Sequence, residues 1–131
     1  MVNWLAVIVA GIVMFAIGAV WYTALFGERW RKLMGVPEGA QAEGFVQAMV
    51  VGFIANLVEA YILAVFIGYV IARSDLVTGA LVGVWAWIGF VATIMVPSVF
   101  YERKPVMLVV INGAYQLVGL IVMGAIIGWW R

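Results

Sequence analysis

The sequence contains no cysteine and no histidine, and only 10% of its 131 residues are charged. The absence of cysteine excludes disulfides, thiol chemistry and iron–sulfur ligation, and the absence of histidine removes the commonest ligand for zinc, copper and haem iron. We therefore expect no cofactor and no metal site. Serine occurs only as Ser74 and Ser98, and neither has a histidine to act as its base, so we expect that the protein is not an enzyme.

The low charge content also limits the partners of the protein. The formal net charge is +1, and the basic residues form no run that would neutralise phosphate groups, so nucleic-acid binding is not expected. Hydrophobic residues make up 68% of the chain, and its charged fraction is far below the roughly one quarter that is typical of soluble domains. The composition indicates an integral membrane protein whose main partner is the lipid bilayer.

The hydrophobic residues fall into four long blocks, at about 2–26, 45–72, 76–100 and 106–130. Each block exceeds the ~20 residues that a helix needs to cross a hydrocarbon core about 30 Å thick. The connections between the blocks are too short to hold a soluble domain. We predict an all-α protein in which residues 1–131 form a single transmembrane domain, an integral membrane bundle of four transmembrane helices.

The distribution of basic residues predicts how these helices are oriented. With four spans, both termini and the turn at Arg73 lie on one side of the membrane, and the connections 27–44 and 101–105 lie on the other. The second side carries five basic residues and the first side carries two. The positive-inside rule therefore places the second side in the cytoplasm and both termini outside. Apolar residues recur at helical spacing from Phe26 to Met34, which fits either a short helix in the headgroup region or a solvated basic loop.

A short sequence echo raises the question of an internal duplication. The segment Phe26–Arg29 follows the first block, and the similar segment Phe100–Arg103 follows the third. A duplicated helix hairpin, with both hairpins in the same orientation, would produce such an echo.

One charged residue, Glu59, lies near the middle of a predicted span. A carboxylate at that depth costs at least ~2.5 kcal/mol, so it is expected to be part of a site or of a structural pairing. Asn56 lies three residues before it, on the same helix face. Polar side chains on other spans reach a similar depth, and we expect them to face Glu59 because lipid offers them no partners. The predicted intramembrane polar site comprises Glu59, Asn56, Gln116, Asn112, Tyr115 and Trp87.

The indole of Trp87 needs a hydrogen-bond acceptor in a region without water. We expect an oxygen of Glu59, Asn56 or Gln116 to supply it. The alternative interpretation is that these polar residues only hold the helices together. Hydrogen bonds between membrane helices are common in packing and stabilise it by about 0.6 kcal/mol each on average.

Small residues indicate where helices approach each other closely. Gly79 and Gly83 in the third block, and Gly124 and Gly128 in the fourth, have the four-residue spacing that allows backbone-to-backbone packing. The spacing does not decide whether these glycines close the bundle or join protomers, and we expect the protein to self-associate. Pro97 is expected to kink the third helix, because it frees a backbone carbonyl about one turn earlier.

Several segments of the chain are similar to segments of one known family. These segments are Asn3–Ala6, Gly18–Tyr22, Gly89–Thr93, Ile111–Val118 and Met123–Gly128. On these motifs the chain resembles the DUF1761 family of small bacterial membrane proteins, and the resemblance covers nearly the whole chain. It implies a multi-pass four-helix protein of the bacterial cytoplasmic (inner) membrane with no established activity.

A second resemblance rests on two residues. Asn56 and Glu59 are similar to the Asn-x-x-Glu motif in the second helix of the membrane-associated eicosanoid and glutathione metabolism family, whose members are oligomeric four-helix proteins. In that family, arginines that hold glutathione precede the motif. Here the preceding turns, Met49–Phe53, carry no charge.

Three functional hypotheses follow. An intramembrane acid that exchanges a proton for a ligand indicates an oligomeric transporter, a channel-like protein or a lipophilic-ligand-binding protein. Its ligand would be a small solute, an ion or a lipophilic molecule. The first alternative is an accessory or structural membrane subunit in which Glu59 pairs with a partner. The second is a membrane enzyme with a bundle like that of the eicosanoid and glutathione family.

Overall fold

The computed structural model describes residues 2–36 and 44–131. Four of its helical stretches are long and apolar enough to cross a membrane, namely Trp4–Leu25, Phe45–Val70, Leu76–Tyr101 and Val106–Trp129. Their ends lie within two residues of the predicted blocks. The described residues contain no β-strand, and the prediction of an all-α chain with four such helices is confirmed.

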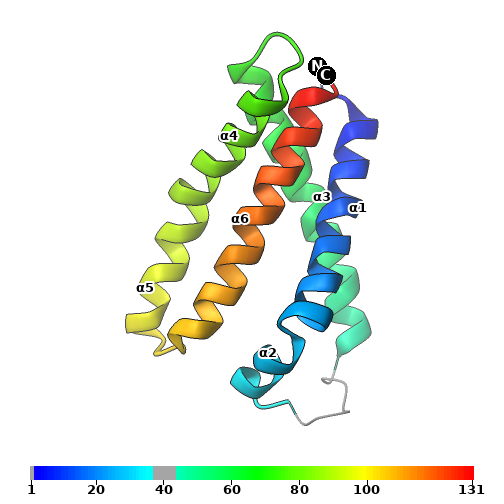
Figure 1. Ribbon diagram of the computed structural model, residues 1–131. Helices are drawn as coiled ribbons and strands as arrows, with labels where there is room; N and C mark the ends of the chain where they lie inside the picture. The colour runs from blue at the N-terminus through cyan, green and yellow to red at the C-terminus, as the bar shows by residue number, and fades with distance from the viewer. Residues whose placement is uncertain (1, 37–43) are drawn as a thin grey trace.

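The four spans are built from regular and irregular helical segments. The first span consists of α1 (Trp4–Val20) and the π-helical segment η1 (Trp21–Leu25), and it is followed by α2 (Gly27–Met34). The second span is α3 (Phe45–Val70). The third consists of α4 (Leu76–Ala86), the π-helical segment η2 (Trp87–Ala92) and α5 (Thr93–Tyr101). The fourth is α6 (Val106–Trp129). The spans run side by side, with both termini at one end and α2 at the other (Figure 1).

Asn3 connects the two ends of the chain. Its side-chain oxygen accepts hydrogen bonds from the backbone N–H groups of Leu5 and Ala6, which are left unpaired by the start of α1. Its Nδ2 donates to the carbonyl of Trp130 at 2.9 Å. The termini therefore lie together, at the same end of the bundle as the turn between α3 and α4, as the sequence predicted (Figure 1).

The irregular segments η1 and η2 both begin at a tryptophan, Trp21 and Trp87. The hydroxyls of Thr23 and Thr93 each donate to the backbone carbonyl four residues earlier. Such back-bonding by threonine competes with the helical hydrogen bonds and often bends helices. Pro97 lies inside α5, after η2. The irregular part of the third span therefore begins well before its proline.

The segment after the first span forms a short helix rather than a loop. In α2, Glu28 and Lys32 make an exposed ion pair at 3.6 Å, and Gly35 ends the helix with a left-handed φ of 72°. The ring of Trp30 packs edge-on against Tyr22, with 5.8 Å between the ring centroids. The aromatic side of α2 thus contacts the first span, and its charged side faces outwards.

The echo between residues 26–29 and 100–103 does not correspond to a repeated structure. Gly27–Arg29 begin α2, whereas Tyr101 ends α5 and Arg103 lies in the loop that follows it, with a φ of 52°. Pro105 disfavours helical backbone in the residue before it, which fits the end of the third span at Tyr101. The echo is therefore no support for a duplicated hairpin.

The glycine pairs of α4 and α6 pack against each other within the chain. A Cβ added at Gly79 would overlap the carbonyl oxygen of Gly124 and lie 2.8 Å from the Cα of Gly128. A Cβ at Gly83 would overlap the carbonyl oxygen of Leu120. These glycines therefore close the bundle by backbone contact, which answers the question that their spacing left open.

The core lies where α1, α3 and α6 meet. Its buried members are Val7, Ala10 and Met14 of α1, Ala60, Leu63, Ala64 and Ile67 of α3, and Tyr115, Leu120, Met123 and Ile127 of α6. Because α6 packs against α4 through the glycines and against α1 and α3 through this core, it is the central helix of the bundle. α4 packs only loosely against α3, and the site described next lies between these two helices.

Candidate functional site

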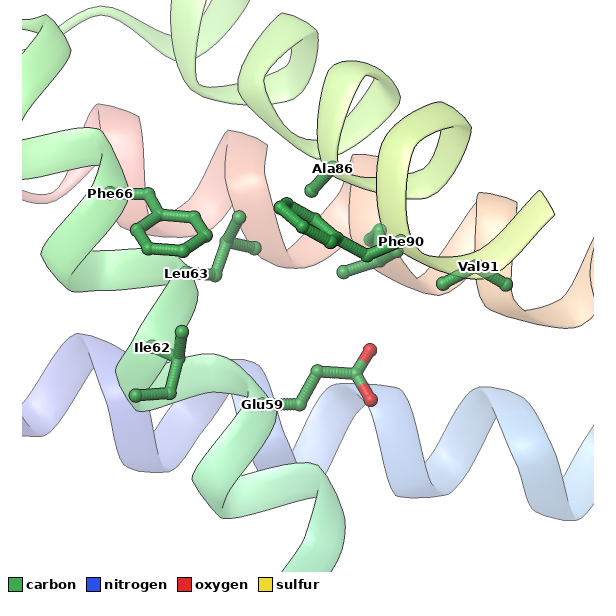
Figure 2. Close-up of a pocket in the computed structure, with 8 residues that line it drawn as sticks. Glu59, Ile62, Leu63, Phe66, Ala86, Phe90 and Val91 are labelled. Carbon is green, nitrogen blue, oxygen red and sulfur yellow. The ribbon is translucent and has the colours of Figure 1, made fainter. Parts of the chain in front are cut away.

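Glu59 lies on α3, near the middle of the second span. Its side chain is half-buried, and its Oε1 atom is fully buried without a hydrogen-bond partner among the described residues. The carboxylate points away from α3 into the space below Phe90 and Val91 (Figure 2). A buried polar atom without a partner loses its hydration and gains nothing in exchange, so this carboxylate is expected to have a partner in the working protein.

Glu59 lines a cavity of about 380 Å³. Three helical segments besides α3 contribute to its walls, and every lining residue except Glu59 is apolar. The lining residues are Glu59, Ile62, Leu63, Phe66, Ala86, Phe90, Val91 and Leu120. Its size falls at the lower end of the range of about 300–1,000 Å³ that is typical of small-molecule sites.

The cavity opens on the outer face of the bundle, between α3 and the third span. Phe90 is 65% exposed and Phe66 is 40% exposed, and their rings approach each other with 6.4 Å between centroids. Both side chains stand at the cavity wall (Figure 2). In a bilayer this face meets acyl chains, so the route from the surroundings to Glu59 runs through lipid.

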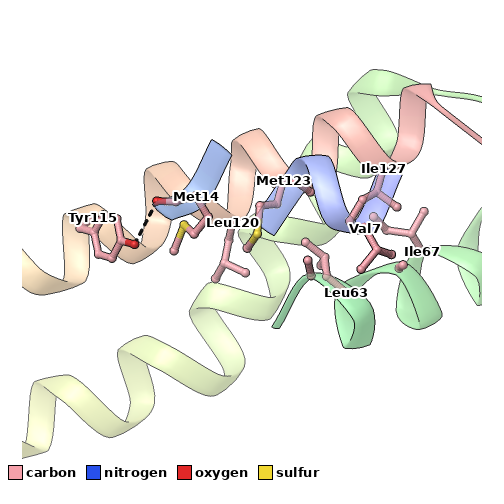
Figure 3. Close-up of a cluster of buried hydrophobic side chains, with 11 residues drawn as sticks. Val7, Met14, Leu63, Ile67, Tyr115, Leu120, Met123 and Ile127 are labelled. Atoms are coloured by element: carbon pink, nitrogen blue, oxygen red, sulfur yellow. Dashed lines mark hydrogen bonds between the residues drawn. The ribbon is translucent and has the colours of Figure 1, made fainter. Parts of the chain in front are cut away.

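Asn56 and Tyr115 are two predicted site residues that lie beside Glu59. Asn56 is buried, one turn before Glu59, and its side chain hydrogen-bonds with the Tyr115 hydroxyl. That hydroxyl also donates to the backbone carbonyl of Met14 at 3.2 Å. The bond is drawn in Figure 3, where Tyr115 and Met14 stand at one end of the buried cluster. Asn56 and Tyr115 therefore link α3, α6 and α1 beside Glu59.

Asn112 forms its hydrogen bond with the first span. Its Oδ1 accepts a hydrogen bond of 2.6 Å from the hydroxyl of Tyr22, in η1. The neighbouring residue of η1, Trp21, donates from its indole to the carbonyl of Ile111 at 3.0 Å. Asn112 thus fastens the end of the first span to α6, and the ring of its partner Tyr22 packs against Tyr115 with 5.4 Å between centroids. Gln116 is half-buried on α6 and makes no hydrogen bond with the described residues.

The expected acceptor for Trp87 was wrong. Its indole donates to the backbone carbonyl of Gly113 at 2.9 Å, and not to an oxygen of Glu59, Asn56 or Gln116. A Cβ built at Gly113 would lie 3.9 Å from the Trp87 ring, an ordinary contact distance, so the ring packs directly against this part of α6. Trp87 therefore fastens the third span to α6, as Trp21 fastens the first.

The sequence did not indicate the apolar walls of the cavity. Phe66, Ala86 and Phe90 are apolar residues in apolar spans. In such spans, positions that face lipid, a cavity or another helix are occupied by the same apolar residue types. Only Glu59 gave a signal, because a carboxylate at that depth has a large transfer cost.

A family model described as a protein of unknown function (DUF1761) matches residues 5–128. The chain belongs to the DUF1761 family. The match extends over all four spans and confirms the resemblance that the sequence motifs suggested. No curated protein matches the chain. No solved structure matches it either. DUF1761 membership therefore brings no assigned activity to the cavity at Glu59, and its chemistry has to be argued from its own residues.

Proposed function

We propose that this DUF1761 protein binds an amphipathic ligand from the bilayer at Glu59 and exchanges it for a proton, as a transporter or lipophilic-ligand-binding protein. One observation carries the proposal: Glu59 Oε1 is buried without a partner, at a cavity of about 380 Å³ whose other walls are apolar. A residue that served only for packing would have its oxygen satisfied by a neighbouring helix, as Asn112 does with Tyr22. We assign no catalytic chemistry to the chain.

The setting of the cavity supports a ligand that enters from lipid. Its exposed wall, Phe66 and Phe90, lies on the outer face of the third and second spans. Apolar walls bind the apolar part of a ligand, and the single carboxyl group fixes its polar end. An intramembrane acid that alternates between a proton and a ligand is a common element of proton-coupled transport.

The proposal also includes the location of the protein. We place it in the bacterial cytoplasmic membrane, with the end that carries α2 in the cytoplasm and both termini outside, because the α2 end has five basic residues and the other end two. Self-association is part of the proposal as well, since van der Waals packing and hydrogen bonds between the spans of two copies hold membrane helices together.

The test is a comparison of ligand-driven proton movement in proteoliposomes that contain a trapped pH indicator. The probes are amphipathic compounds with one shared tail and a cationic, neutral or anionic head. We expect the wild-type protein to respond to at least one head class and Glu59→Gln to respond to none. Ala86→Phe fills the cavity and should abolish the response, whereas Ala16→Phe, on the exposed face of α1, should preserve it.

The rival function, an accessory subunit, predicts a different result. There, Glu59→Gln would change the assembly state seen by native mass spectrometry, and no probe of any head class would distinguish wild type from the variants. That combination of results would refute the proposed ligand site.

A further inference from the structure

The charge of the cavity walls limits what can bind there. The only charged lining residue is Glu59, and no lysine or arginine lines the cavity. The basic residues Arg73, Arg103 and Arg131 are exposed, beyond the ends of the spans. An anionic head would therefore bring a charge with no counter-charge into a region of low dielectric, which is strongly unfavourable whether Glu59 is ionised or protonated. A head without charge or donor would leave Glu59 Oε1 unpaired, as it is now.

From these groups we infer that the ligand is a lipophilic amine that binds as its protonated ammonium form, with an N–H donated to Glu59. This inference rests on the proposed function. A protonated amine supplies both things that the buried oxygen lacks, a positive charge and a hydrogen-bond donor, and charge-assisted hydrogen bonds are the strong ones. A quaternary ammonium supplies the charge but no donor.

The two phenyl rings at the cavity wall favour the same ligand class. Phe66 and Phe90 lie 6.4 Å apart at an interplanar angle of 40°. Their ring faces attract a cation within about 6 Å, and this attraction grows when water is excluded. The remaining walls, Ile62, Leu63 and Val91, accommodate a hydrocarbon tail.

The cavity volume sets the size of the tail. An engineered apolar cavity of about 150 Å³ holds one benzene molecule. The volume of about 380 Å³ here accommodates a tail of two fused rings together with a small amine head.

Binding of the ammonium form requires a balanced proton exchange. An unpaired carboxylate is costly in an apolar site, so without ligand Glu59 carries its proton. When the ammonium passes from water through the lipid and binds, the O–H bond of the carboxyl group breaks and that proton goes to water. The ammonium keeps its own proton and donates the N–H to the carboxylate. One proton is released for each ligand bound, and the complex is neutral overall.

The experiment uses four compounds that share a naphthylethyl tail and differ in the head, which is dimethylamino, trimethylammonium, isopropyl or carboxylate. Binding to the full chain in lipid nanodiscs is measured by equilibrium dialysis against empty nanodiscs. We expect the dimethylamino compound to bind at least about tenfold more tightly than the trimethylammonium compound, because only the former donates a hydrogen bond. The isopropyl and carboxylate compounds should bind no more than they do to empty nanodiscs.

Two further measurements test the mechanism. The apparent Kd of the amine should fall about tenfold for each pH unit of increase, while the free amine remains protonated, because one proton is released. Glu59→Gln should remove both the binding and this pH dependence. Phe90→Leu should weaken amine binding by about threefold, as expected for the loss of one cation–π contact, whereas Phe100→Leu at the exposed end of α5 should not.

The outcomes separate the two proposals. If the isopropyl or carboxylate compound binds best, and Glu59→Gln and Ala86→Phe abolish that binding, the amine inference is wrong and the ligand site stands. If no head class binds and a single cysteine at Phe66 crosslinks two copies, the cavity is an interface and both proposals fail. The absence of native cysteine makes that crosslink unambiguous.

Discussion

The hydroxyl of Tyr22 donates a hydrogen bond of 2.6 Å to Oδ1 of Asn112, and this bond joins the π-helical end of the first span to the fourth. We expect Tyr22→Phe to lower the free energy of unfolding by about 0.5–1.5 kcal/mol, the usual contribution of such a bond. A double-mutant cycle with Asn112→Leu, measured by unfolding in mixed detergent, isolates the pair. Additive single effects would mean that the bond contributes nothing.

Replacement of Glu59 separates a functional role from a structural one. Because its Oε1 is buried without a partner, Glu59→Leu should raise the free energy of unfolding by about 1–3 kcal/mol and abolish the ligand response. Glu59→Gln keeps the shape and serves as the matched control for loss of charge. A large loss of stability in Glu59→Leu would indicate that the carboxylate has a structural partner, and it would contradict the proposed site.

The glycine contacts between α4 and α6 predict that the stability of the protein depends steeply on the size of the side chain at these positions. Gly83→Ala should destabilise the protein by about 1–3 kcal/mol, because the added Cβ would overlap the Leu120 carbonyl oxygen, a backbone atom. Gly52→Ala is the control, since a Cβ there meets no atom within 4 Å, and it should be neutral or stabilising. Thermal unfolding of both variants in the same detergent provides the comparison.

The hydrogen bonds that Asp75 makes at the start of α4 predict that pH changes the local stability of this helix end. A hydrogen bond from the Thr78 hydroxyl, together with backbone N–H groups, holds the pKa of the Asp75 carboxyl below its ordinary value of 3.8. A pKa lowered on folding adds stability at neutral pH, and this addition is lost as the pH falls below that ordinary value. Amide exchange at Val77 and Thr78 should therefore be faster in Asp75→Asn than in wild type at pH 6. The difference should shrink in acid, and an equal difference at pH 6 and pH 3 would contradict this account.

The absence of cysteine allows the predicted orientation to be measured directly. Single cysteines at Ser74 and at Glu102 lie at opposite ends of the bundle. A membrane-impermeant maleimide added to intact spheroplasts should label Ser74→Cys, and it should label Glu102→Cys only after lysis. The reverse pattern would place the termini in the cytoplasm.

The spans were predictable because each one is a separate, strong signal. Within Phe45–Val70, for example, an 18-residue window has a mean hydropathy of 2.2. In lipid, a helix satisfies all the backbone hydrogen-bonding groups of such a segment. The pairing of these spans was less predictable. The spacing of Gly79 and Gly83 indicated close contact, but the identity of the facing helix depends on how all four spans pack.

The irregular segments and the site show where the sequence signal ends. η1 and η2 coincide with hydrogen bonds from the Thr23 and Thr93 hydroxyls to the backbone, which compete with helical hydrogen bonds, and such an effect is too small to stand out in a sequence. Glu59 was identifiable from its depth alone. Its cavity was not, because a wall residue such as Phe90 differs from a lipid-facing phenylalanine only in what lies opposite to it.

The central position of α6 has a consequence for biosynthesis. Leu120, Met123 and Ile127 complete the core, and Gly124 packs against Gly79, yet α6 leaves the ribosome after the other three spans. The first three helices therefore enter the bilayer before the helix that they all pack against exists. Until then, the polar groups that α6 satisfies, including the indole of Trp87, have to find temporary partners. A chain that stops before Val106 would consist of inserted but unassembled helices, which a membrane protease can recognise as unfinished.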